Sequence, residues 1–418
     1  MQSATACAAG HCPVPQRTNP GEGRGEGPAV RLREGAMRVL FLAPTRYVAT
    51  MTFACEAIFD LAARGHHVDV LVSSECHPPF DLAAPRVVIE RFPDSLTSPL
   101  RGLFAGLRAA AERRFRAQRY DLLVGLSQAG VIIAHRLAAR HGLPYVYFND
   151  EIWFGDGRAP GVKRLYGRMI KWLECRANRG AAFTVTQDPL RGRHLADVNR
   201  IPIETMRFLP NSPRGPAFRQ PSTFLHEHLR LPAAARIVLW CGRIAFGDGA
   251  DELATSALRW PSDLFLVFHF PAYSWISAPR RRRIMEIHGQ GQVRVTDLQL
   301  GFQELDPLFR SAFVGIVFYE GKTLNTRLIG HSSGKLNSFL RAGVPCIVND
   351  YEGLRWVQEG GAGIAVGGAE GVLDAVQRIA AGYDAFSRAA LELFERELSF
   401  SRKFAAIAEE MERRAGGP

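Results

Sequence analysis

Residues 331–348 read HSSGKLNSFLRAGVPCIV, a small polar turn followed by an amphipathic segment and an apolar run. Leu336, Phe339 and Leu340 recur at the i, i+3 and i+4 spacing that places side chains on one face of a helix. A serine before this segment can cap the helix, and Gly343 with the proline two residues later can end it. The apolar residues at 346–348 then predict a buried strand, so the stretch predicts one turn–helix–strand unit.

The turn before the predicted helix consists of Ser332, Ser333 and Gly334, and Lys335 falls in the first helical turn. Small residues allow backbone N–H groups at a helix N-terminus to point at an anion, and Lys335 adds a full positive charge. This combination predicts a site for a nucleoside diphosphate. The local sequence also fits a plain helix cap followed by a solvated lysine, and it does not decide between the two interpretations.

A longer block contains this stretch. Residues 313–319 read FVGIVFY and precede a polar loop with Asn325. Together with residues 331–348 they resemble the block D-V-G-L-x-P-Y … N … K-L-x-E-Y-x-A-A-G-x-P-V-I of GT-B glycosyltransferases, family four and its relatives. The resemblance implies an α/β fold with two Rossmann-like parallel-sheet domains that face a cleft, and a C-terminal helix that crosses back onto the first domain.

The same resemblance implies a type of reaction. It implies a UDP- or GDP-sugar as donor substrate, no bound cofactor or metal, and a hexosyltransferase that retains the anomeric configuration. In such a mechanism the departing diphosphate helps to take the proton of the acceptor, so no protein nucleophile is needed. No G-x-G-x-x-G fingerprint follows the first strand of either half, which argues against NAD.

Size and composition bound the interpretation. The chain has 418 residues, which suggests two domains, and 47% hydrophobic with 22% charged residues is ordinary for a globular protein. No apolar run reaches the roughly 18 residues of a membrane span. Seven scattered cysteines fit a reducing compartment, so we expect a cytoplasmic protein. The net charge of +11 suits nucleic acid, anionic membrane or a phosphorylated substrate, and does not choose among them.

The order of the predicted elements gives the domain organisation. Strands alternate with helices in both halves, which predicts parallel sheets built from right-handed βαβ units. Residues 207–211 resemble the interdomain V-x-P-N-G motif of the family, with Ser212 in place of the glycine. We therefore expect a disordered tail (1–36), an acceptor domain (37–210), a nucleotide-sugar domain (211–385) and a C-terminal helical segment on the first domain (386–418).

Gly242 and Arg243 follow the predicted strand 237–241. Ligands of open α/β sheets bind beyond the carboxyl ends of strands, and arginine holds phosphate oxygens through two parallel donors. The pair matches the start of the family's G-R-x-x-x-x-K-G motif, whose lysine is missing here, so we expect Lys335 to supply the second charge. A surface arginine that follows a strand is the alternative interpretation.

Two positions of the second half lack the carboxylates of the family, and the role of one arginine in the first half stays open. Its E-x7-E carboxylates, the second of which binds ribose, fall on Gly330 and Ser338. A serine hydroxyl can still bond a sugar hydroxyl, but without the charge of a carboxylate. In the first loop, Arg46 could face the leaving diphosphate or an acidic acceptor.

The first half offers two adjacent carboxylates, Asp150 and Glu151, after a predicted strand. The segment resembles the family stretch that ends in H-E or H-D, with Asp150 in the position of the histidine that lies close to the sugar. Carboxylates at the end of a strand could bind or polarise a sugar or acceptor hydroxyl. A solvated loop or a helix cap is the alternative interpretation.

A basic amphipathic helix is predicted from residue 162. Its apolar stripe consists of Val162, Leu165, Met169, Trp172 and Leu173. Its cations are Lys163, Arg164, Arg168 and Lys171. We expect the stripe to pack on the sheet of its own domain, while the cations could draw the domain to anionic lipid.

These observations favour a cytoplasmic, nucleotide-sugar-dependent glycosyltransferase of surface or exopolysaccharide synthesis. Its partners would be the donor, a glycan or lipid-linked acceptor and, peripherally, the anionic inner face of the cytoplasmic membrane, with no nucleic acid. A sugar-nucleotide epimerase of the same fold and a degenerate GT-B binding subunit are the alternatives. The missing lysine and carboxylates favour the degenerate subunit, and the intact Ser-Ser-Gly-Lys block argues against it.

Overall fold

The structure is a computed structural model of the whole chain. It describes residues 35–76, 84–93, 102–154, 161–242, 248–270, 282, 285–300 and 304–416. The side chains of residues 102–104 and 162–163 are outside this description. Residues from Ala36 onward form one compact unit, and the tail predicted for residues 1–36 lies outside the described residues up to residue 34.

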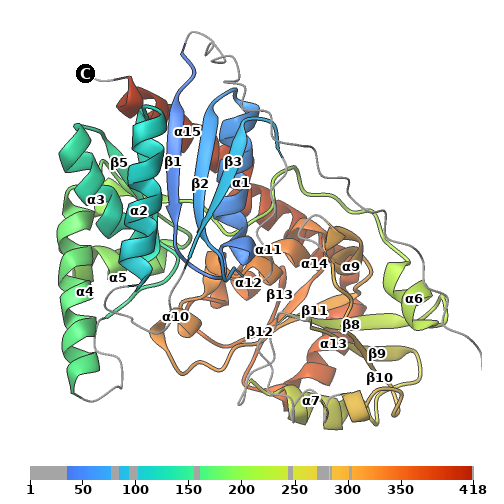
Figure 1. Cartoon of the computed structure of the whole chain (residues 1–418). Coiled ribbons are helices and arrows are strands. Elements are labelled where there is room, and N and C mark those ends of the chain that lie inside the picture. Colours follow the sequence, from blue (N-terminus) through green and yellow to red (C-terminus); the bar gives the residue numbers. More distant parts are fainter. Residues whose placement is uncertain are drawn as a thin grey trace, which may run out of the picture. The chain divides into compact units, whose positions relative to one another are not determined.

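The first half of the chain forms a parallel sheet with the strand order β3-β2-β1-β4-β5-β6-β7 (Figure 1). Its strands are β1 (Arg38–Ala43), β2 (His67–Ser73), β3 (Val87–Phe92), β4 (Leu122–Leu126), β5 (Tyr145–Phe148), β6 (Thr184–Thr186) and β7 (Met206–Phe208). The central strands are apolar along their whole length because helices cover both faces of the sheet. The predicted order of alternating strands and helices is confirmed.

Helices cover the two faces of this sheet separately. Val39 and Phe41 of β1 pack on one face with α1 (Thr52–Ala63) and α15 (Phe400–Ala415). Leu40 and Leu42 point to the other face, which is covered by α2 (Gly102–Ala117), α3 (Ser127–His141) and α4 (Val162–Arg179). Because α15 contributes Phe404 and Met411 to the first core, the predicted return of the C-terminal helix to the first domain is confirmed.

The second half forms a parallel sheet with the order β10-β9-β8-β11-β12-β13. Its strands are β8 (Arg236–Cys241), β9 (Leu264–His269), β10 (Val293–Thr296), β11 (Val314–Val317), β12 (Cys346–Asn349) and β13 (Gly363–Val366). In both sheets the strand order reverses beside the first strand, and such a reversal is where ligands of this class of fold bind. The domain boundaries at residues 210 and 385 stay a prediction.

Two layers of helices enclose this second sheet. One face holds α7 (Ala250–Ala257) and α13 (Val372–Ala381). The other holds α6 (Phe224–Leu229), α9 (Asp306–Arg310), α11 (Gly334–Arg341), α12 (Arg355–Glu359) and α14 (Tyr383–Leu393). Leu336, Phe339 and Leu340 of α11 are all buried in this layer, which confirms the helix face that the sequence predicted. No helix in the described part of the chain is long and apolar enough to cross a bilayer.

The orientation of α4 differs from the prediction. Leu165, Met169 and Trp172 were expected to pack on the sheet, but their exposed fractions are 70%, 45% and 57%. The helix turns Ile170 and Ala177 inward instead. Lys171, one of the expected surface cations, is buried in an ion pair with Glu174, with Nζ and Oε2 at 3.1 Å. The inward face of α4 is thus partly polar because it carries a hydrogen-bonded network. Three residues of the predicted stripe face solvent, whereas Leu173 packs against the core.

Candidate functional site

The turn before α11 forms the predicted helix cap. Ser333 is buried, and its Oγ accepts a hydrogen bond from Leu336 N at 3.3 Å. The Tyr319 hydroxyl also hydrogen-bonds Ser333 Oγ, at 2.6 Å. Ser333 therefore fixes the geometry of the turn. The first amides of the helix, at Gly334 and Lys335, have no carbonyl one turn earlier within the helix and are the groups that can face an anion.

The Lys335 ammonium lies beyond the carboxyl ends of β8 and β11. Its Nζ donates to the Phe318 carbonyl at 3.2 Å and lies 4.5 Å from the ring centroid of Tyr319 and 5.5 Å from that of Trp240. Burial lowers the pKa of Lys335 from 10.5 to about 8, although Cys241 and Asp248 oppose this shift. The lysine is therefore still mostly charged at pH 7.

Gly242 adopts a backbone conformation that favours glycine. Its φ is +105°, in the left-handed region, and its N–H donates to the His269 carbonyl at 2.9 Å. The chain thus turns sharply at the carboxyl end of β8, the strand that carries Trp240. Arg243 lies outside the described residues, so its pairing with Lys335 on one diphosphate stays a prediction.

The structure gives a physical reason for the glycine at position 330. Gly330 has a φ of +26°, and a Cβ at this position would overlap Asp188 Oδ2. That oxygen accepts a hydrogen bond from His331 N at 2.9 Å, while Oδ1 caps α5 (Pro189–Asn199). A side chain at position 330 is excluded because a carboxylate from the first half of the chain occupies its space. Ser338 lies one turn after Lys335 and is partly buried.

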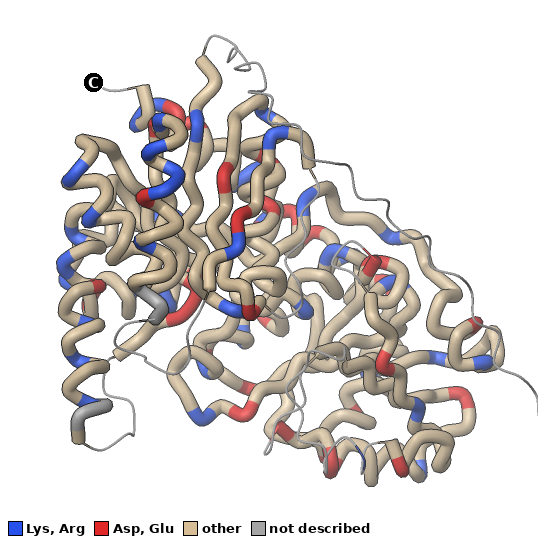
Figure 2. Tube along the Cα trace, viewed as in Figure 1, with Lys and Arg blue, Asp and Glu red and all other residues tan. Residues whose placement is uncertain are grey.

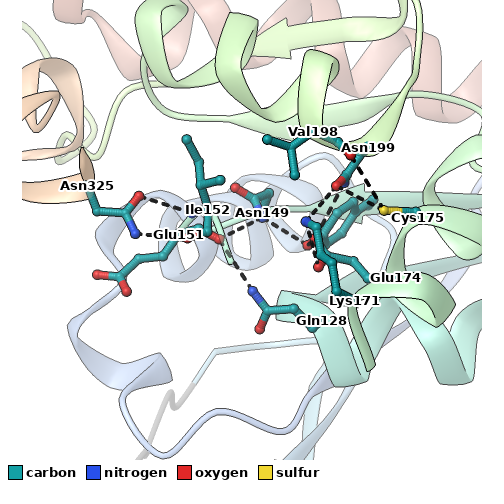
Figure 3. Close-up of polar contacts among 11 residues, drawn as sticks. Gln128, Asn149, Glu151, Ile152, Lys171, Glu174, Cys175, Val198, Asn199 and Asn325 are labelled. Atoms are coloured by element: carbon teal, nitrogen blue, oxygen red, sulfur yellow. Dashed lines mark hydrogen bonds and ion pairs between the residues drawn. The ribbon is translucent and has the colours of Figure 1, made fainter. Parts of the chain in front are cut away.

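Asp150 and Glu151 lie just beyond β5, and Ile152, which follows them, contacts Asn325 of the second half of the chain (Figure 3). Asn325, in α10 (Leu324–Arg327), accepts from Ile152 N at 3.1 Å and donates to Ile152 O at 3.0 Å. Arg191 donates to the carbonyls of Asp150 and Asn325 at 3.2 and 2.5 Å. Tertiary structure thus brings together the carboxylate pair and the polar loop that the sequence singled out separately.

A buried network supports the same segment from the other side (Figure 3). The Asn149 amide donates to the Tyr147 hydroxyl at 2.9 Å and to the Glu151 carbonyl at 3.1 Å. The Tyr147 hydroxyl donates to Glu174 at 2.9 Å, and Glu174 is paired with Lys171. The buried ion pair therefore helps to position the backbone of residues 149–151, and it is not exposed at the protein surface.

The two carboxylates differ in environment. Burial, and to a smaller extent the neighbouring charge of Glu151, raise the pKa of Asp150 from 3.8 to about 6. Glu151 itself is exposed, and its carboxylate points away from the Lys171–Glu174 pair (Figure 3). Asp150 is therefore the carboxyl group of this pair that can change its charge near neutral pH.

The comparisons with known proteins concern part of the sequence and the fold. Residues 52–212 match the glycosyl transferase 4-like domain family. The chain has the GT-B fold. No curated protein sequence matches the chain.

Solved structures with the GT-B fold resemble the chain over almost its whole length. Sucrose-phosphate synthase from Thermosynechococcus elongatus has a TM-score of 0.70 at 16% identity, over 91% of this chain and 100% of that one. HepE from Anabaena, in complex with UDP-glucose, has a TM-score of 0.63 at 13% identity, over 90% of this chain and 99% of that one. WaaG, a glycosyltransferase involved in lipopolysaccharide biosynthesis, has a TM-score of 0.59 at 14% identity, over 88% of this chain and 98% of that one. At these identities the likeness establishes the GT-B fold.

Arg46 is already paired. It follows β1 and forms an ion pair with Glu75, which follows β2, with Nη2 and Oε2 at 2.7 Å. Both side chains lie near the carboxyl ends of their strands, the edge at which the GT-B fold binds ligands. Since Glu75 neutralises its charge, Arg46 is a weaker partner for a diphosphate than Lys335, and its role stays a prediction.

Several residues that shape the site escaped the sequence analysis as site residues. Asn211 accepts from Phe53 N at 3.0 Å and donates to the Ser332 carbonyl at 3.2 Å, so it joins the start of α1 to the turn before α11. Asp188 and Arg191 contact the second half of the chain through His331 and Asn325. The Asp-Pro pair at 188–189 is a recognisable helix-start signal, but only the tertiary structure shows the second role of this carboxylate.

Proposed function

We propose that the protein is a glycosyltransferase that moves a sugar from a nucleotide-diphosphate donor to a glycan or lipid-linked acceptor. The observation that carries the proposal is the place of Lys335, whose ammonium lies at the N-terminus of α11 beyond β8 and β11. A positive charge and free helix amides at this edge are suited to a diphosphate. Asp150 and Glu151, which precede the Ile152 backbone bonded by Asn325, supply polar groups for a sugar from the first half of the chain.

The proposed reaction retains the anomeric configuration. The acceptor oxygen forms a bond to the anomeric carbon of the donor sugar while the bond from that carbon to the diphosphate oxygen breaks. The acceptor proton passes to the departing diphosphate. Lys335, Arg243 and the α11 amides stabilise the charge that develops on the diphosphate, an effect that can be worth several kcal/mol.

The donor class also rests on the neighbours. HepE was solved with UDP-glucose, which supports a nucleoside diphosphate sugar, and a UDP- or GDP-hexose is proposed here. WaaG acts in lipopolysaccharide biosynthesis, which supports a role in surface or exopolysaccharide synthesis. No bound cofactor enters the proposed reaction.

A second candidate is a sugar-nucleotide epimerase of the same fold. The raised pKa of Asp150, to about 6 through burial, favours it because epimerisation needs a carboxyl group that can exchange protons near neutral pH. In the transferase the same group would bind a hydroxyl. A GT-B subunit that only binds a glycan or a partner enzyme is the third candidate, which the departures at Gly330 and Ser338 favour.

The test combines binding with turnover. Calorimetry with UDP, GDP and the corresponding nucleosides should show that the diphosphate contributes most of the affinity. Release of nucleoside diphosphate that depends on an added acceptor would support the transferase. Interconversion of the sugar nucleotide without acceptor would support the epimerase, and binding without either reaction would leave the binding subunit.

We also infer that the protein works in the cytoplasm, at the inner face of the membrane. The proposed contact surface is the exposed apolar stripe of α4 (Leu165, Met169 and Trp172). Arg164 and Arg168 are exposed on the same helix, and Lys and Arg recur along α4 (Figure 2). Exposed apolar side chains among cations fit an anionic lipid surface. Such a contact would bring a lipid-linked acceptor to the protein.

A further inference from the structure

The amino ends of three central strands of the second sheet border a cavity of about 260 Å³. Its lining includes Ile237 near the start of β8, Phe313 just before β11 and Val344 two residues before β12. Lys335 and Gly242 lie at the other ends of these parallel strands, where β11 and β8 finish. The cavity is therefore at the opposite edge of the sheet from the proposed donor site.

The lining of this cavity is positively charged. It contains Arg219, Arg236 and Arg310, and none of the described residues that line it is acidic. Arg219 pairs with Asp384 at 3.4 Å and Arg236 with Asp263 at 2.7 Å, but both carboxylates lie outside the lining, and their side chains are 84% and 49% exposed. Ion pairs this exposed to water are weak, so the cavity keeps a positive potential.

Arg310 has the least compensated charge of the three arginines. Its Nε donates to the Gln220 carbonyl at 2.5 Å, and its guanidinium carbon lies 5.4 Å from the ring centroid of Phe218. In the described part of the chain no carboxylate pairs with it, and its two terminal amino groups donate no hydrogen bond. Arginine binds phosphate oxygens through parallel donors of this kind. Arg310 can therefore hold an oxyanion.

An aromatic pair restricts the other two arginines. Phe313 and Tyr383 stack with their ring centroids 4.5 Å apart. The guanidinium carbon of Arg236 lies 5.5 Å from the centroid of Phe313, and that of Arg219 lies 5.3 Å from the centroid of Tyr383. A guanidinium that lies over a ring keeps N–H groups at its edge for hydrogen bonds. Because these side chains are already ordered, an anion loses less entropy in binding them.

His226 adds a hydrogen-bond acceptor to the lining. Its Nε2 bonds the Ala235 carbonyl at 2.9 Å, so Nε2 carries the hydrogen and Nδ1 of the neutral ring can only accept. This Nδ1 is buried and has no partner within the described residues. An ionised phosphate oxygen cannot donate to it, whereas a hydroxyl or a water molecule can. The lining thus suits a ligand that combines an oxyanion with hydroxyl groups.

The volume of the cavity limits the size of the ligand. Pockets for small molecules usually measure about 300–1,000 Å³, and about 260 Å³ lies just below this range. The cavity is therefore suited to a small metabolite rather than to a nucleotide sugar.

We propose that this cavity is a second binding site, specific for a small phosphate monoester that carries hydroxyl groups, such as a sugar phosphate. Arg310 binds the phosphate together with Arg219 and Arg236, and His226 Nδ1 accepts from a hydroxyl. The site shares none of the residues proposed for the donor, so this inference goes beyond the proposed function and does not depend on it.

Isothermal titration calorimetry of the full chain tests the site with three probes: inorganic phosphate, glucose 6-phosphate and glucose. Glucose 6-phosphate, which has both kinds of group, should bind most tightly. Arg310→Gln should weaken its binding about tenfold or more, as expected for the loss of hydrogen bonds to a charged group. Arg310→Lys keeps the charge without the parallel donors and should lose less. Lys335→Ala, at the opposite edge of the sheet, should leave the affinity unchanged.

A pair of surface variants tests the same site without a change in the core. Ala233 is exposed and lines the cavity, whereas its neighbour Ala234 is exposed and does not line it. Ala233→Glu places a carboxylate at the cavity and should weaken glucose 6-phosphate binding about tenfold through charge repulsion. Ala234→Glu changes the net charge equally and should bind like wild type. Both variants should unfold at the temperature of the wild-type protein.

Three results would overturn the inference. The first is a wild-type protein that binds neither phosphate nor glucose 6-phosphate at millimolar concentration. The second is glucose 6-phosphate binding that Arg310→Gln and Ala233→Glu leave unchanged, including the case in which Lys335→Ala abolishes it. The third is binding of inorganic phosphate as tight as that of glucose 6-phosphate, because the hydroxyl groups would then contribute nothing. A protein that fails to bind UDP would refute the proposed function and leave this site unaffected.

Discussion

Replacing Lys335 by alanine should weaken the binding of UDP and leave the binding of uridine nearly unchanged. Lowering the pKa from 10.5 to about 8 means that the folded protein carries the charge of Lys335 at a cost of roughly 3 kcal/mol relative to water, at about 1.4 kcal/mol per pKa unit. A diphosphate beside the ammonium offsets that cost. The loss of a hydrogen bond to a charged group is worth about 1.5–3 kcal/mol, which corresponds to a roughly 10- to 100-fold weaker affinity.

The pH dependence of binding gives a sharper form of this prediction. The free protein loses the Lys335 proton as the pH rises through about 8, whereas the bound diphosphate holds the proton on the lysine. Affinity for UDP should therefore fall by about tenfold for each pH unit above 8, at 1.4 kcal/mol per unit. Lys335→Arg should abolish this dependence because a guanidinium does not titrate in this range.

Isothermal titration calorimetry between pH 7 and 9.5 measures these quantities. Lys322→Ala is the matched control, since Lys322 is an exposed lysine paired with Glu320, and it should leave the affinity unchanged. Equal affinity of wild type and Lys335→Ala for UDP would refute the diphosphate site at α11. A constant wild-type affinity between pH 7 and 9.5 would refute the argument from burial.

Three further outcomes are expected. The pKa of Asp150 is about 6 in the folded protein against 3.8 unfolded, so the free energy of unfolding should fall as pH rises from 4 to 6. Asp150→Asn should therefore be more stable than wild type at pH 8, by at most about 3 kcal/mol, but not at pH 3.5. Chemical denaturation at both pH values measures this difference. Gly330→Ala should lose about 1–3 kcal/mol of stability because its Cβ meets the Asp188 carboxylate, while Gly382→Ala, whose Cβ has its nearest neighbour at 3.8 Å, should show no such loss in thermal denaturation. Replacing Leu165, Met169 and Trp172 by serine should reduce salt-sensitive co-sedimentation with anionic vesicles, and so should replacing Arg164 and Arg168 by glutamate. The control variant, with the exposed Arg378 and Arg388 replaced by glutamate, should co-sediment like wild type. A wild-type protein that stays in the supernatant at low salt would contradict the membrane contact.

The apolar stripe of α4 shows where the sequence prediction failed and why. A 3.6-residue period predicts that Leu165, Met169 and Trp172 share one face, and they do. The period does not say which face meets the sheet. That was decided by the network in which the Lys171–Glu174 pair of α4 bonds Tyr147, a residue of β5 that comes close only once the sheet has formed.

The sequence by itself predicted the GT-B fold through the family resemblance of residues 313–319 and 331–348. It also predicted the cap of α11, because a helix cap depends on residues that are neighbours along the chain. Leu336 faces the core and Ser333 caps the helix as the spacing predicted. Contacts across the chain were decided only by the tertiary structure. Asp188 fills the place of a side chain at Gly330, and Asn325 hydrogen-bonds the backbone of Ile152. Such contacts depend on how parallel strands align, and residues that are distant in sequence carry no local signal of that alignment.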